Sequence, residues 1–152
     1  NYTAQNMGAE KPERVRQGFR AGLKLVWMLS VPLVALYLLC SRTVLRLFLD
    51  NPTGQAMQVG IQFLRILSPF YFVISAKLVS DGILRGAGLM KQFMAATFTD
   101  LILRVALAFL LSGPFGTVGI WSAWPIGWTV AMVLSIRFYV KGPWNRKETI
   151  AR

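Results

Sequence analysis

Four charged side chains lie within apolar stretches of this chain and are the residues best placed to do chemistry: Lys77, Asp81, Asp100 and Arg104. Lys77 and Asp81 are four residues apart, as are Asp100 and Arg104, so each pair falls on one face of a helix. A charge near the centre of a bilayer costs roughly 2.5 kcal/mol or more, and it is normally paired or turned toward a cavity. These residues therefore predict an intramembrane charge network.

The network has more than one possible pairing. In an antiparallel hairpin around the glycine-rich corner after Arg85, Lys77 lies level with the stretch before Asp100, which predicts a Lys77–Asp100 bridge. Asp81 can pair instead with Lys77 or Arg85, and Asp100 with Arg104. The excess of bases favours pairs that neutralise one another and fix the hairpin. The alternative is that Asp100 responds to a proton or cation.

A second, uncharged polar set accompanies these charges. Ser68, Tyr71 and Ser75 recur on one helix face at the spacing i, i+3, i+7, and Thr97 is grouped with them. They are candidates to line a polar cavity, or to hydrogen-bond neighbouring helices. The residues do not decide between these two roles.

The composition indicates a membrane protein without a catalytic centre. Apolar residues make up 55% of the 152 residues and charged residues only 15%, below the usual quarter or so. There is no histidine and one cysteine, Cys40, so no disulfide framework or zinc spacing is predicted. LRGAG is too short for a nucleotide fingerprint, and no Ser/His/Asp grouping is visible. We expect no enzymatic activity, cofactor or metal.

Four apolar stretches predict an all-α integral membrane fold, since about 20 residues cross a bilayer. The predicted transmembrane helices are 21–40, 59–81, 93–111 and 118–140. Between and around them we expect a cytoplasmic loop and helix entry (1–20), an external loop (41–58), a cytoplasmic turn (82–92), an external turn (112–117) and a frayed cytoplasmic tail (141–152). Within these segments, Asn6–Gly8 predicts a break, Lys11-Pro12 a helix start, and residues 50–54 a turn.

The distribution of basic residues predicts the orientation. Twelve of the 17 Lys and Arg residues lie in the first loop, the cytoplasmic turn and the tail or at the adjoining ends of the spans, whereas only Arg42 and Arg46 lie on the other side. Lys and Arg concentrate in cytoplasmic segments, so both ends of the chain are predicted to be cytoplasmic. The same distribution explains the net charge of +11 without a nucleic-acid partner.

Four motifs follow one another along the chain: AQNMGAEKPERVRQGFR (4–20), SPFY (68–71), GILRGAG (82–88) and FGTVGIWSAWPIGW (115–128). In this order they resemble the last third of a multidrug and toxic compound extrusion (MATE) transporter. The resemblance implies that the four spans are helices nine to twelve, part of one six-helix lobe of a two-lobed transporter. It also implies a bacterial plasma-membrane antiporter that exports drugs or small organic cations by alternating access, in exchange for Na⁺ or H⁺.

The sequence departs from the family pattern at one position, and alternative functions remain open. The sodium-coupled branch carries an acid in helix ten, at a position that falls near Ile74 here, so the coupling-ion site is expected outside this chain. The expected partners are the bilayer, the small cationic substrates and a missing N-terminal part of the same polypeptide. The alternative functions are a lipid-linked oligosaccharide flippase of the same superfamily and a non-transporting membrane subunit.

Overall fold

The chain folds as an all-α bundle, as the sequence predicts. The computed structural model describes residues 1–49 and 54–145, and within them no strand occurs. The helices are α1 (Tyr2–Gly8), α2 (Pro12–Arg46), α3 (Gln55–Leu67), α4 (Tyr71–Gly86) and α5 (Met90–Val140), with short 3₁₀ turns η1 (Ser68–Phe70) and η2 (Pro143–Asn145). Most of the predicted turn at 50–54, and residues 146–152 of the predicted tail, lie outside the described residues.

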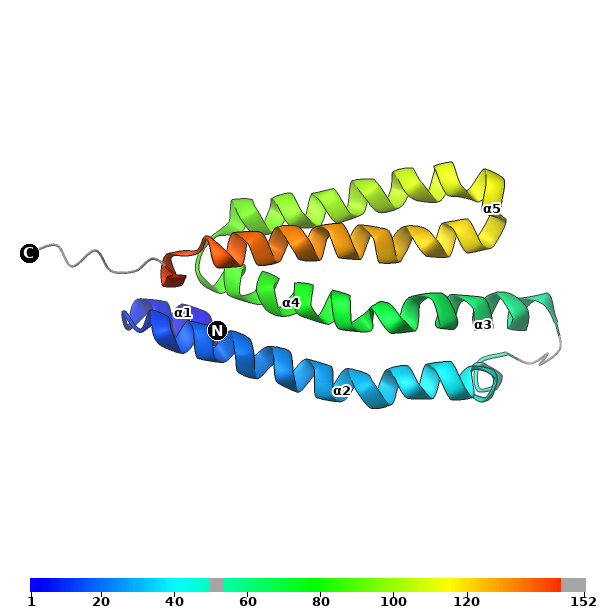
Figure 1. Ribbon diagram of the computed structural model, residues 1–152, viewed down its shortest axis with the longest axis horizontal. Coiled ribbons are helices and arrows are strands. Elements are labelled where there is room, and N and C mark those ends of the chain that lie inside the picture. The colour runs from blue at the N-terminus through cyan, green and yellow to red at the C-terminus, as the bar shows by residue number, and fades with distance from the viewer. Residues whose placement is uncertain (50–53, 146–152) are drawn as a thin grey trace, which may run out of the picture.

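Three long helical runs lie side by side in the bundle (Figure 1). They are α2, the α3–η1–α4 run, and α5, which doubles back on itself. The α4 helix is central, because it packs against both α5 and α2. The short elements α1 and η2 lie at the same end of the bundle (Figure 1).

The first break in the chain lies later than predicted. Asn6–Gly8 is helical, so the prediction of a break there is wrong: the Asn6 amide donates to the Tyr2 carbonyl and holds the turn together. The chain leaves α1 at Ala9 and passes through Glu10, whose φ is +55°. The predicted helix start is confirmed, with Pro12 in the first turn of α2, where a missing N–H is tolerated.

The second predicted span is not one continuous α-helix. The α-helical hydrogen bonding gives way to the 3₁₀ turn η1 at Ser68–Phe70. Pro69 explains this interruption, because it has no N–H to donate to the preceding turn. The helix resumes as α4 and ends at Gly86, where Gly88 with φ +75° lets the Leu89 N–H bond back to the Leu84 carbonyl at 2.8 Å.

The third and fourth predicted spans are the two arms of α5. The reversal is at Gly116 (φ +56°, ψ −135°), inside the segment 112–117 where the sequence predicts a turn. This left-handed backbone is readily available only to glycine. Just beyond it, a Cβ on Gly119 would lie 2.1 Å from the Leu111 carbonyl oxygen, so the reversal also requires a residue without a side chain there.

A buried apolar cluster ties the chain together at the end that carries α1 and η2. It joins α2, α4, α5 and η2 through five residues: Val15, Ile83, Leu84, Tyr139 and Trp144. The side chain of Trp144 is only 1% exposed and lies 5.4 Å from the Tyr139 ring. The prediction of a frayed tail is therefore wrong for its first five residues.

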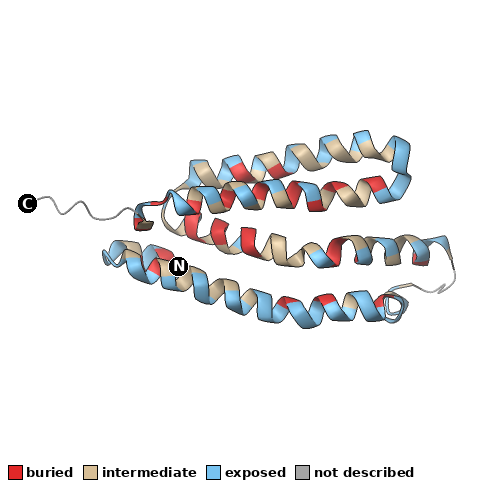
Figure 2. Cartoon of the chain, in the orientation of Figure 1, coloured by how far each residue is buried: buried red, intermediate tan, exposed pale blue. Residues whose placement is uncertain are grey.

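Much of each helix is exposed at the surface of the bundle (Figure 2), and many of the exposed side chains are large and apolar. Large side chains such as Met28, Leu39, Ile102 and Phe109 are 65–84% exposed. Three helical stretches, Pro12–Arg46, Gln55–Gly86 and Met90–Val140, are long and apolar enough to cross a membrane. Each arm of α5 has roughly 25 residues, sufficient for a crossing of its own. The chain is therefore a multi-pass membrane protein.

Candidate functional site: a charge network between α4 and α5

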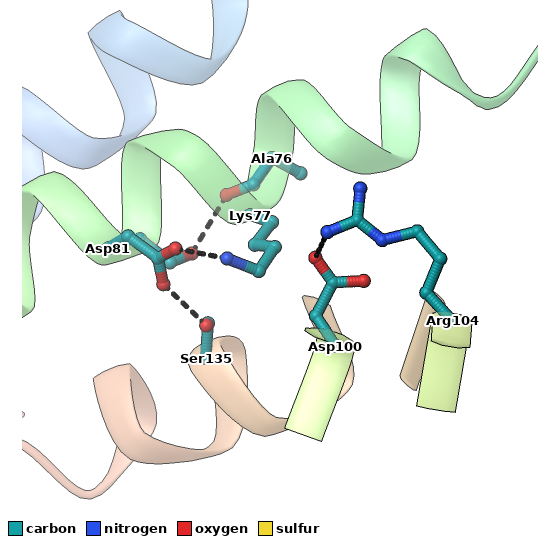
Figure 3. A network of polar contacts seen from close by, with 7 residues as sticks. Ala76, Lys77, Asp81, Asp100, Arg104 and Ser135 are labelled. Carbon is teal, nitrogen blue, oxygen red and sulfur yellow. Dashed lines mark hydrogen bonds and ion pairs between the residues drawn. The ribbon is translucent and has the colours of Figure 1, made fainter. Parts of the chain in front are cut away.

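Lys77 and Asp81 form a closed, buried ion pair on α4 (Figure 3). The Lys77 Nζ lies 2.5 Å from Asp81 Oδ2, and the two residues are 5% and 2% exposed. The second carboxylate oxygen, Oδ1, accepts a hydrogen bond of 2.6 Å from the Ser135 hydroxyl on the second arm of α5. Both oxygens of Asp81 are therefore engaged, and the carboxylate links α4 to α5.

Asp100 and Arg104 form a second, looser pair on the first arm of α5. Arg104 Nη2 lies 3.3 Å from Asp100 Oδ2, and the Arg104 side chain remains 25% exposed. Asp100 Oδ1 is buried and has no hydrogen-bond partner among the described residues. This carboxylate therefore keeps an unused acceptor site.

The two pairs form along their own helices rather than between them. The described residues contain three ion pairs: Lys77–Asp81, Asp100–Arg104 and an exposed Glu13–Arg16 pair near the start of α2. The predicted Lys77–Asp100 bridge across the hairpin is thus not formed. The physical reason is that Lys77 already has Asp81 one helical turn away, at the spacing where side chains of a helix meet.

Small residues allow the helices around the network to approach closely. A Cβ on Gly127 would lie 2.7 Å from Asp100 Oδ1 and 3.5 Å from Arg104 Cβ, so the two arms of α5 meet at a glycine. Ser80, next to Asp81 in the chain, is fully buried and donates to the Ala76 carbonyl within α4. Its donor is thereby satisfied without a partner on another helix.

The uncharged polar set predicted from the sequence is not brought together as one hydrogen-bonded group. Ser68 donates to the Leu64 carbonyl, and Ser75 to the Phe72 carbonyl at 3.1 Å, so both bonds stay within the local helical run. Tyr71 instead lies among aromatic rings. The Thr97 hydroxyl is buried without a hydrogen-bond partner in the described part of the chain. Whether these residues line a cavity stays a prediction.

Three residues of the site were not identified from the sequence. Ser135 and Gly127 carry no pattern that separates them from other small residues in an apolar helix. Trp124 was named only as part of the motif at 115–128, yet its ring centre lies 4.6 Å from Arg104 Cζ, a cation–π contact. The spacing of Arg104 and Trp124 gives no sign of this contact, because the hairpin at Gly116 creates it.

Long apolar helices that enclose paired charges define a helical multi-pass membrane protein. The MatE family model matches residues 2–110, and the chain belongs to the MatE family. The predicted family resemblance is thereby confirmed.

A curated relative agrees with this assignment. The "Probable multidrug resistance protein YoeA" of Bacillus subtilis (strain 168) is 23% identical over 150 residues, which are 97% of this chain and 32% of the relative. The chain thus spans about a third of the length of that relative. No solved structure matches the chain significantly.

Proposed function

We propose that this chain forms part of one lobe of a secondary active transporter that exports drugs or organic cations in exchange for Na⁺ or H⁺. The observation that carries the proposal is a buried charge network within membrane-crossing helices of a MatE-family chain. The name of the Bacillus subtilis relative, a probable multidrug resistance protein, supports drugs as the cargo. The coverage of about a third of that relative supports a role as one part of a larger transporter.

The two ion pairs have different roles in this proposal. In the Lys77–Asp81–Ser135 group both carboxylate oxygens are engaged, so the group fixes α4 against α5 during the transport cycle. The Asp100–Arg104 pair is longer and partly exposed, so it is the pair that rearranges when the transporter changes conformation. The coupling ion binds elsewhere in the transporter, because Ile74, near the position where the sodium-coupled branch carries an acid, has no side-chain oxygen that could bind a cation.

The orientation follows from the charges. Twelve basic residues lie in the segments around α1, the α4–α5 turn and the tail, and the opposite connections carry two. We infer that α1 and η2 face the cytoplasm. The buried cluster around Trp144 then closes the cytoplasmic end of these helices.

The test is dye export by the complete polypeptide that contains this chain, expressed in cells that lack their own exporters. Wild-type cells are expected to extrude ethidium faster than vector cells, and Asp100→Asn to lower the rate by about tenfold or more. Glu13→Gln is the matched control, because Glu13 is an acid in an exposed pair, and its loss should leave export unchanged. Ethidium retention by wild-type cells equal to that of vector cells contradicts the exporter. Normal export by Asp100→Asn leaves that residue only a structural role.

A further inference from the structure

A row of aromatic rings leads away from the Asp100–Arg104 pair. Trp124 lies under the Arg104 guanidinium, and its ring centre is 5.8 Å from that of Trp128. Trp128 is followed by Tyr71 at 6.3 Å, and Tyr71 by Tyr37 on α2 at 5.9 Å. The row therefore extends from the second arm of α5 across α4 to α2. Aromatic faces beside a carboxylate are the surroundings that bind organic cations.

The carboxylate at the head of this row is incompletely paired. The Arg104–Asp100 contact of 3.3 Å is longer than the about 2.7–2.9 Å of a strong charge-assisted hydrogen bond. The other oxygen, Oδ1, is buried without a partner in the described residues, and it faces Gly127. Burial of an unsatisfied acceptor is unfavourable, so Asp100 favours the approach of a further positive group.

The same chain offers a direct comparison in Asp81. That carboxylate is also buried, but Lys77 and Ser135 occupy both of its oxygens. No aromatic–cation contact of Lys77 occurs in the described residues, in contrast to Arg104 over Trp124. Asp81 is thus built as a permanent pair, whereas Asp100 is not.

Arg104 itself has the properties of a planar organic cation. Its guanidinium is flat, permanently charged and stacks on aromatic faces. It lies on Trp124 and beside Asp100. A quarter of its side chain is exposed, so the guanidinium can move away from Asp100 toward the surface.

We propose that Asp100 and Trp124 form a subsite for a planar organic cation, and that Arg104 occupies this subsite until the cation displaces it. The inference rests on the proposed function and adds where, and against which resident group, a cationic substrate binds. When a resident group competes for the subsite, the apparent affinity equals the intrinsic affinity multiplied by the fraction of time for which the subsite is free. Removal of that competitor should therefore tighten the binding of cations while leaving uncharged ligands unaffected.

The test uses two ligands that share the same planar ring system but differ in charge. N-methylacridinium carries a fixed positive charge, whereas acridine is uncharged at mildly alkaline pH. Both are titrated calorimetrically against the purified complete polypeptide. Arg104→Ala is expected to bind N-methylacridinium on the order of tenfold more tightly, with acridine unchanged. Trp124→Leu should weaken N-methylacridinium about fivefold or more. Arg65→Ala is the matched control, since Arg65 is an exposed arginine on α3.

The outcomes separate this inference from the proposed function. If the wild-type protein binds neither ligand and exports no dye, the proposed function itself is contradicted. If it exports dye but Arg104→Ala binds N-methylacridinium no more tightly than wild type, the displacement of Arg104 is wrong. If Arg104→Ala fails to fold, the same two ligands are titrated against the Asp100→Asn/Arg104→Gln variant, which keeps the net charge of the protein. Loss of the preference for N-methylacridinium over acridine supports the subsite, and an unchanged preference overturns it.

Discussion

The Lys77–Asp81 pair gives a quantitative test of how charge is held inside these helices. Asp81→Asn removes the negative charge but keeps the shape and an oxygen that can accept from Ser135. Lys77, 5% exposed and 2.5 Å from its partner, is then left as an unpaired buried cation. Breaking one side of a buried pair typically destabilises a protein by about 3–5 kcal/mol. We expect that loss for Asp81→Asn, and a similar one for Lys77→Met.

The double variant is the more informative member of the set. Lys77→Met/Asp81→Asn leaves no buried charge, and methionine fills much of the volume of the lysine stem. Removal of both charges leaves no uncompensated buried charge, and such a replacement is often close to neutral when the volume is kept. The free energy of unfolding of the double variant should therefore lie within about 1 kcal/mol of the wild-type value. The two single losses would then be far from additive.

The assay is equilibrium unfolding of the complete polypeptide in mixed micelles with increasing dodecyl sulfate, followed by tryptophan fluorescence. The exposed Glu13–Arg16 pair is the control, because removing either of its members should cost less than about 1 kcal/mol. The reasoning is refuted if Asp81→Asn is as mild as that control. It is equally refuted if the double variant loses the sum of the two single effects.

Three further substitutions test the packing around the network, each by the same unfolding assay. Gly127→Ala should destabilise the protein by about 1–3 kcal/mol, because its Cβ would lie 2.7 Å from Asp100 Oδ1; wild-type stability would show that the arms of α5 are farther apart. Ser135→Ala should lose about 1.5–3 kcal/mol, as expected for a hydrogen bond to charged Asp81, and a neutral effect would argue against that bond. Trp144→Ala should lose about 3–5 kcal/mol from the buried cluster; no loss would mean that η2 is undocked.

The fold class was predictable from the sequence because lipid imposes a strong constraint on it. Long uncharged stretches in a membrane must be helical, since every backbone group has to be satisfied within the segment. The reversal at Gly116 was likewise predictable, as Gly113, Pro114 and Gly116 cluster there. The 3₁₀ interruption at Pro69 was not predicted, although prolines in membrane helices are often absorbed by such local adjustments.

The members of the charge network were predictable, but their pairing was not. Charged residues in apolar runs are conspicuous, and both observed pairs have the i, i+4 spacing that a helix favours. The predicted Lys77–Asp100 bridge depended on the relative rotation of two helices, which side-chain packing determines. The contributions of Ser135, Gly127 and Trp124 depend on the return of α5 beside its own first arm, and no local pattern encodes that contact.

Transport by the purified protein tests the central claim most directly. The complete polypeptide that contains these helices is reconstituted into vesicles, and ethidium movement is followed under an imposed Na⁺ or H⁺ gradient. The account predicts that one of these gradients drives ethidium against its own concentration gradient, and that Asp100→Asn strongly slows this movement. Ethidium that only equilibrates under both gradients would contradict the assignment of this chain to an antiporter.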